Sequence, residues 1–181
     1  MVRRTVWAIQ KQLKSGEFEP EGVEVVFQGG RIDRVDTMET DDGKLYVRVI
    51  DYKTGNTSFD LVSLYHGLQL QLMIYMDGAL TVEQNKHKDK DVIPAGVFYY
   101  NIKDPMIQEK IDADVEAVSA GLMKELKMNG LVQADPELVY RMDSSLGSIP
   151  VAFNKDGSFR KNSSVADRTQ FAAVSYTHLR A

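Results

Sequence analysis

Two neighbouring stretches of the chain alternate apolar and polar residues with the period of a β-strand. They are Gly30–Asp36 and Leu45–Lys53, and side chains two residues apart on a strand share one face. The linker Met38–Lys44 contains Asp42-Gly43, a pair typical of tight hairpin turns. The pattern therefore predicts an antiparallel hairpin with one buried face.

The residues after this hairpin predict a long helix. Phe59–Glu83 has no internal Pro and carries apolar residues at helical spacing. Gln71 and Tyr75 are four residues apart, so they share a face of this helix. A glutamine on an apolar face needs a hydrogen-bond partner. It is either a core residue satisfied by nearby backbone or a group that points into a functional site.

The rest of the chain predicts an α/β fold. The expected elements are helices at Arg4–Leu13, Ile107–Leu126 and Val165–Val174, a short helix from Asp135-Pro136, strands at Val23–Gln28 and Val92–Ile102, and a small hairpin of Ile149–Phe153 with Ser158–Arg160. Asn129-Gly130 is expected to end the second of these helices. Three adjacent strands, a helix and another strand predict a mixed central sheet flanked by helices.

Composition is that of one globular domain. The chain has 181 residues, 43% of them hydrophobic and 27% charged, which predicts a single soluble domain. No apolar run approaches the roughly 20 residues of a membrane span, and the N-terminus lacks a signal-peptide pattern. We therefore expect a cytoplasmic protein without a membrane partner. The run Lys86–Lys90 is either a solvated loop or a phosphate contact.

Two acids and a lysine on the hairpin are candidates for chemistry. If the turn closes at residues 41–43, Asp33 and Asp51 lie close together at the open end, with Lys53 on the Asp51 face and Tyr52 on the other. Two nearby carboxylates repel unless a cation is present. Mg²⁺, or alternatively Mn²⁺, accepts carboxylate and carbonyl oxygens as ligands. Such a set suits metal-assisted hydrolysis of a phosphodiester.

A plainer interpretation exists for the same residues. Asp33 and Asp51 could cap strand ends while Lys53 forms a surface salt bridge. The net charge of −4 argues against general coating of DNA, which uses a basic surface, but it does not exclude a metal-dependent nuclease. The three histidines, at 66, 87 and 178, have no metal-ligand spacing and predict no zinc site.

Several stretches together resemble a known family. Gly30–Asp36, Ile50–Gly55 and Gly67–Tyr75 resemble, in order and spacing, the nuclease motifs of the PD-(D/E)XK superfamily, and more narrowly its RecB-type branch with a Gln-x-x-x-Tyr helix. Flanking stretches such as Pro94–Tyr100 and Asn129–Val132 are similar to the C-terminal nuclease domains of AddB/RexB-type B subunits of bacterial ATP-dependent helicase–deoxyribonucleases. The resemblance covers roughly Glu17–Phe171.

This resemblance implies a restriction-endonuclease-like core and a role for each matching residue. The metal ligands would be the carboxylates of Asp33 and Asp51 and the backbone carbonyl of Tyr52. Lys53 would orient the attacking water or stabilise charge on the phosphate, and Gln71 and Tyr75 would hold the DNA strand. Arg31 and Arg34 would contact phosphates, unless they are solvated surface arginines.

The chain also departs from the family. Members carry an iron–sulfur cluster held by cysteines, but this sequence has no Cys and cannot bind it. No Gly-x-x-x-x-Gly-Lys-Ser/Thr phosphate loop is present, so ATP hydrolysis is not expected here. Residues 175–181 do not resemble the family. We expect a partial nuclease domain at residues 1–174 and a tail of doubtful origin at 175–181.

Three functional hypotheses follow. The favoured one is a Mg²⁺-dependent exonuclease domain that cuts single-stranded DNA during double-strand break repair, with the DNA supplied by the A subunit of a helicase–nuclease. The second is a catalytically silent DNA-binding or scaffolding module of the same fold. The third is a stand-alone RecB-type exonuclease that works without that partner.

Overall fold

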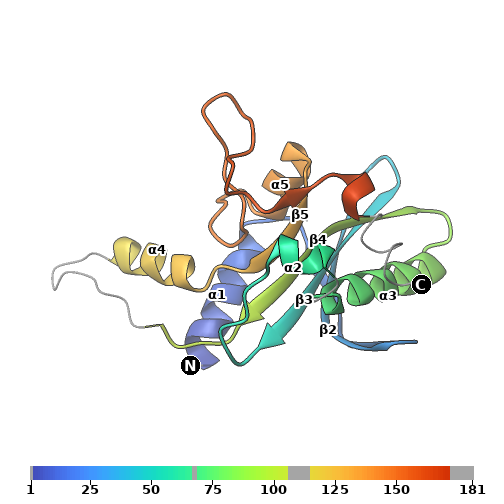
Figure 1. Ribbon diagram of the computed structural model, residues 1–181, viewed down its shortest axis with the longest axis horizontal. Helices are drawn as coiled ribbons and strands as arrows, with labels where there is room; N and C mark the ends of the chain where they lie inside the picture. The colour runs from blue at the N-terminus through green and yellow to red at the C-terminus, as the bar shows by residue number, and fades with distance from the viewer. Residues whose placement is uncertain (1, 67–68, 106–114, 172–181) are drawn as a thin grey trace.

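A six-stranded mixed sheet forms the centre of the computed structural model, which describes residues 2–66, 69–105 and 115–171 (Figure 1). Its strands, in spatial and chain order, are β1 (Glu19–Phe27), β2 (Gly30–Glu39), β3 (Lys44–Lys53), β4 (Asp91–Asn101), β5 (Asn129–Gln133) and β6 (Val165–Ala166). β1, β2 and β3 pair antiparallel, β4 runs parallel to β3, β5 is antiparallel to β4, and β6 is parallel to β5. The predicted mixed sheet is confirmed.

Helices cover both faces of this sheet. They are α1 (Val2–Lys14), α2 (Leu61–Tyr65), α3 (Gln71–Lys86), α4 (Val115–Glu125) and α5 (Pro136–Met142). α2 and α3 pack with one face of the sheet in a core that includes Leu64, Leu72 and Met76. α5 packs in a second core on the other face, with Leu138 and Val139, and Ile9 of α1 borders it. No helix in the described ranges is long and apolar enough to cross a bilayer.

The β2–β3 hairpin has the predicted register. Arg34 pairs with Ile50 and Glu39 with Leu45. Gly43 adopts a positive φ of 80°, a conformation that glycine reaches without steric cost, and its N–H donates to the Thr40 carbonyl at 3.0 Å. The turn therefore sets which side chains of the two strands face each other.

The single long helix predicted at Phe59–Glu83 is wrong, because the structure has two helices there. Asp60 caps α2 by accepting hydrogen bonds from the N–H groups of Val62 and Ser63. The Gln69 side chain then turns back, accepting from Asp60 N–H at 2.8 Å and donating to the Ser58 carbonyl at 2.9 Å. In one continuous helix, residues nine apart would be about 13 Å apart along the axis. This tether therefore requires a break between α2 and α3.

The helix stop predicted at Asn129-Gly130 is also wrong, because these residues begin β5. A Cβ at Gly130 would lie 1.9 Å from the Val97 carbonyl oxygen of β4, so glycine is needed for the close approach of the two strands. Asn129 fastens the loop before α2, because its side-chain amide donates to the Thr57 carbonyl at 3.1 Å.

The C-terminal predictions had mixed outcomes. Asp135 caps α5 with Pro136 in its first turn, as predicted. The small hairpin is reduced to one bridge between Phe153 and Phe159. Val165–Ala166 is a strand, and residues 168–171 are helical. The first part of the helix predicted at 107–126 and the tail at 175–181 lie outside the described residues.

Candidate active site

Asp33 and Asp51 lie together at the open end of the β2–β3 hairpin. The last regular pair is Arg34 with Ile50, so one further step in the antiparallel register brings Asp33 opposite Asp51. The Asp33 carboxylate accepts a hydrogen bond from the Tyr52 N–H at 2.8 Å. The two predicted acids therefore meet on adjacent strands.

The Asp51 carboxylate is nearly removed from water. The residue is 4% exposed, and burial raises the pKa of its carboxyl group. The Lys53 ammonium, 2.6 Å from Asp51 Oδ2, lowers this pKa, whereas the nearby Asp33 charge raises it. We find no further hydrogen-bond donor for Oδ2 among the described residues. A buried acid with so few donors is suited to a cation.

Lys53 is held between β3 and the start of α3. Its ammonium donates to Gln71 Oε1 at 3.0 Å, and the Gln71 amide donates to the Tyr75 hydroxyl at 2.8 Å. Burial tends to lower the pKa of Lys53, but its hydrogen bond and attraction to Asp51 outweigh this effect and raise the pKa. The lysine therefore stays protonated at neutral pH. The predicted Gln71–Tyr75 face does point at the acidic end of the hairpin.

These groups offer oxygen ligands of the kind that a hard divalent cation prefers. Asp33 uses Oδ2 for the Tyr52 N–H, so this hydrogen bond does not occupy Oδ1. The N–H and C=O of one strand residue point to the same side, so the Tyr52 carbonyl is directed toward the strand edge where Asp33 lies. Two carboxylates and one carbonyl fit Mg²⁺ or Mn²⁺, which bind further waters at the remaining positions.

The structure does not bring Arg34 to this cluster. Arg34 is 5% exposed and its guanidinium binds both oxygens of Asp36, at 2.6 and 2.7 Å. It also donates to the Tyr52 hydroxyl at 3.3 Å, on the face opposite Asp51. The sequence predicted that Arg34 either contacts a phosphate or is a solvated surface residue. Both predictions are wrong because the side chain is buried.

Arg31 is by contrast a surface residue. Its side chain is 60% exposed and lies 3.4 Å from the Glu24 carboxylate. An exposed pair of this kind costs little to open, so Arg31 remains able to contact a phosphate.

The structure also adds Tyr99 to the site, because Tyr99 pairs with Asp51 across β3 and β4. Its ring lies 5.5 Å from the Lys53 ammonium. The sequence predicted Tyr99 only as part of an apolar strand. Its hydroxyl group was the one feature in the sequence that could have marked it as a site residue.

Comparison with protein families identifies the superfamily of the chain. Residues 1–175 match the family model of the PD-(D/E)XK nuclease superfamily. The chain belongs to the PD-(D/E)XK nuclease superfamily. The mixed sheet with flanking helices fits the restriction-endonuclease-like fold of this superfamily.

Curated relatives of this chain are much longer proteins. Two of them, each named as the B subunit of an ATP-dependent helicase/deoxyribonuclease, come from Lachnoclostridium phytofermentans (41% identity over 96% of this chain) and Alkaliphilus metalliredigens (37% over 95%). The chain spans 16% and 17% of their lengths. A repair endonuclease from Pyrococcus abyssi aligns over 57% of this chain and 38% of its own, with 16% identity and a TM-score of 0.30, too low to support an assignment.

Proposed function

We propose that this PD-(D/E)XK domain hydrolyses DNA phosphodiesters with Mg²⁺, or with Mn²⁺ in its place. Asp33, Asp51 and the Tyr52 carbonyl would hold the ion. The observation that carries the proposal is the buried Asp51 carboxylate beside Asp33, with Lys53 as its close partner at 2.6 Å. A purely structural acid at this depth would be expected to receive several hydrogen bonds.

The bound ion and the residues around it would have different roles in the reaction. A bound divalent ion would polarise the phosphate and lower the pKa of a coordinated water. Lys53, kept protonated by Asp51, can donate a hydrogen bond to that water or to a phosphate oxygen. Gln71 holds the lysine ammonium in place through its 3.0 Å hydrogen bond. Lys53 would therefore be held beside the proposed metal site before DNA binds.

DNA would approach from the α3 side of this cluster. Gln71 is exposed and Tyr75 half-buried, so both can contact a strand that places its phosphate near Lys53. Arg31 adds an exposed positive charge at the same end of β2. Arg34 is left out of the proposed interface because its guanidinium pairs with Asp36 inside the protein.

The wider assignment rests on the names of the relatives. We propose that the chain is the nuclease domain, residues 1–174, of the B subunit of a helicase–deoxyribonuclease that functions in the cytoplasm. Its partners would be the A subunit of the same enzyme and single-stranded DNA, which it would degrade as an exonuclease during recombination and repair of double-strand breaks. The 181 residues contain no Cys and so provide no thiolate ligand for the iron–sulfur cluster of the family.

A cleavage assay tests the catalytic proposal. End-labelled single-stranded DNA is incubated with the chain in Mg²⁺ or EDTA, and wild type is compared with Asp51→Asn and Lys53→Ala. Loss of a metal ligand is expected to reduce cleavage by more than about 100-fold, because even partners that only orient ligands matter by about 10–100-fold. Lys44→Ala is the matched control, because its ammonium pairs with the exposed Asp42 at the hairpin turn.

The same samples separate the alternatives. Equal cleavage by wild type and Lys53→Ala would contradict the role given to the lysine. The silent module would be favoured by three results together: the chain binds DNA, it does not cleave DNA, and Mg²⁺ raises its melting temperature in a way that Asp51→Asn abolishes. Cleavage by the chain alone is expected for both the helicase-coupled domain and the stand-alone exonuclease, so the assay is repeated with the A subunit of the helicase–nuclease added. A cleavage rate that the A subunit leaves unchanged would favour the stand-alone exonuclease.

A further inference from the structure

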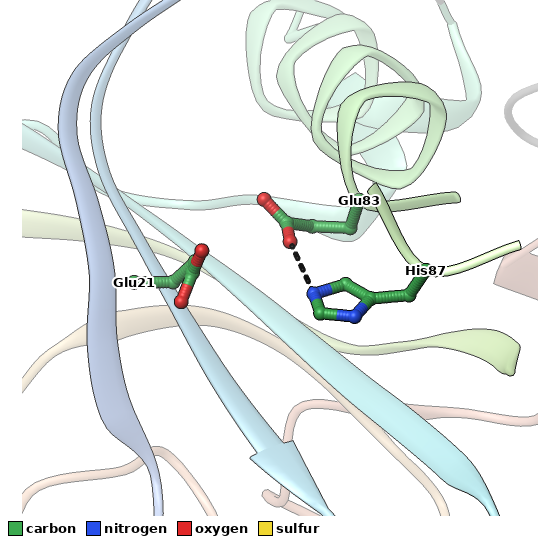
Figure 2. Close-up of side chains that lie close together, drawn as sticks. All are labelled: Glu21, Glu83 and His87. Atoms are coloured by element: carbon green, nitrogen blue, oxygen red, sulfur yellow. Dashed lines mark ion pairs between the residues drawn. The ribbon is translucent and has the colours of Figure 1, made fainter. Parts of the chain in front are cut away.

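A second group of metal-binding side chains lies at the other end of α3. Glu83 and His87 extend from the C-terminal end of this helix toward Glu21 of β1 (Figure 2). One ligand atom from each of the three residues lies within 4.8 Å of the other two. The group lies at the opposite end of α3 from Gln71, and so apart from the candidate active site.

Local structure brings these three residues together. Glu83 and His87 are four residues apart and therefore share one face of the helix. His87 caps the helix end, with its N–H donating to the Glu83 carbonyl at 2.9 Å. Glu21 sits where the β1–β2 register shifts between Pro20 and Gly22. Such a bulge redirects a side chain that a regular strand would align with its neighbours.

The buried carboxylate of Glu83 is the observation that indicates a bound cation. Its side chain is 1% exposed, yet we find no hydrogen-bond donor for its Oε2 in the described part of the chain. His87 Nε2 is 3.7 Å from this oxygen, which is beyond hydrogen-bond distance. A buried carboxylate oxygen without a donor is costly, and here it faces an imidazole and a second carboxylate.

The surroundings favour a cation. The lining of a surface hollow of about 370 Å³ next to the group includes Glu17, Glu19, Glu21, Glu39 and His87. Glu17 and Glu39 already pair with Arg141 and Lys90, which leaves Glu19 and Glu21 as the acids of this lining that can add negative charge at the group. The Lys86 ammonium lies 2.8 Å from Glu83 Oε1 and 3.1 Å from Glu21 Oε1. This lysine side chain is 44% exposed, so it can turn into solvent. Two carboxylates with one ammonium leave one negative charge, whereas a divalent ion would neutralise both.

We propose that Glu21, Glu83 and His87 form a second divalent-metal site that takes a transition metal of the Zn²⁺ class. One imidazole nitrogen and two carboxylate oxygens, with water in the fourth position, match the ligands that Zn²⁺ accepts. Tetrahedral ligands at about 2.1 Å lie about 3.4 Å apart, so the group must contract slightly and release Lys86. The ion would clamp β1 to the end of α3.

Zinc titration of the whole 181-residue chain tests the proposal. Calorimetry is done in an Asp51→Asn background, which removes the candidate catalytic metal site from the measurement. One Zn²⁺ per chain is expected to bind, and His87→Gln is expected to weaken the Kd at least about tenfold. His66→Gln is the matched control, because His66 is an exposed residue at the end of α2.

Lys86→Gln distinguishes a metal site from a network of ion pairs. Removing the competing ammonium is expected to tighten Zn²⁺ binding and to increase the rise in melting temperature on adding Zn²⁺. All variants are compared in the Asp51→Asn background. The proposal is overturned if Lys86→Gln binds no Zn²⁺ there, or if His87→Gln binds Zn²⁺ as tightly as the Asp51→Asn parent. Both variants replace partly exposed side chains, and circular dichroism verifies that they fold.

Discussion

The buried Asp36 carboxylate provides a stringent test of the packing beneath the candidate active site. Asp36 is fully buried and accepts three charge-assisted hydrogen bonds, two from Arg34 and one from Arg48 at 2.7 Å. Arg48 is 2% exposed, and its guanidinium lies 4.9 Å from the centre of the Phe18 ring. Asp36→Asn would leave two buried guanidinium groups without their counter-charge.

The expected cost follows from this geometry. Breaking a buried ion pair by removing one partner typically costs about 3–5 kcal/mol. With a urea dependence of about 2 kcal/mol per molar, the unfolding midpoint should fall by about 1.5–2.5 M. Circular dichroism during urea titration measures this shift. Asp42→Asn is the control, because Asp42 forms an exposed pair with Lys44, and its midpoint should hardly change.

A fall of less than about 0.5 M for Asp36→Asn would refute this reasoning, because it corresponds to only about 1 kcal/mol. Such a result would mean that water or a neighbouring group compensates the two arginines. It would leave the assignment of Asp33 and Asp51 intact, because Asp51 points to the opposite face of β3 from Tyr52 and the Asp33 carboxylate binds the Tyr52 backbone rather than Arg34.

Three further predictions concern the site and the sheet. Without metal, burial raises the folded-state pKa of Asp51, so the folded state binds more protons and stability falls as pH rises above the unfolded value. Asp51→Asn should weaken this dependence and raise the melting temperature of the metal-free protein at neutral pH; a lower melting temperature would contradict it. Gln71→Leu removes the acceptor that orients Lys53 and should slow DNA cleavage by about 10–100-fold without a matching loss of stability; unchanged cleavage would exclude the positioning role. Gly130→Ala forces a Cβ within 1.9 Å of the neighbouring strand and should destabilise the protein by at least about 1–3 kcal/mol, which thermal melts measure. The control Gly55→Ala adds a Cβ that meets nothing within 4 Å and should leave the melting temperature almost unchanged.

The hairpin and its acids were predictable from sequence because they depend on short-range rules. Strand alternation and the turn at Gly43 fix the register, and the register alone brings Asp33 to Asp51. Helix periodicity likewise placed Gln71 and Tyr75 on one face. In each case the partners lie close in the chain or on adjacent strands, so local pattern carries the information.

The failures depend on side-chain partners that the periodicity of apolar residues does not specify. The break between α2 and α3 is set by where the Gln69 side chain finds its partners, and helical periodicity cannot reveal this. Arg34 resembles a surface arginine in the sequence, because the sequence does not show that Arg34 and Arg48 of the adjacent strand share the buried Asp36 carboxylate. The spacing among the three histidines gave no signal of the second group, because the other members are Glu83, four residues before His87, and Glu21 on another element.

The two-residue repeat of the hairpin also limits which insertions the gene could tolerate. One residue added inside β3 between Leu45 and Ile50 would turn Asp51 and Lys53 to the Arg34 side of the sheet. Two added residues would restore the face but move both groups by about 6.6 Å along the strand. Extra residues at the tip, around Asp42, would bulge into solvent and leave the pairing intact. Insertions and deletions among descendants of this sequence should therefore accumulate at the hairpin tip around Asp42 and be absent from β2 and β3.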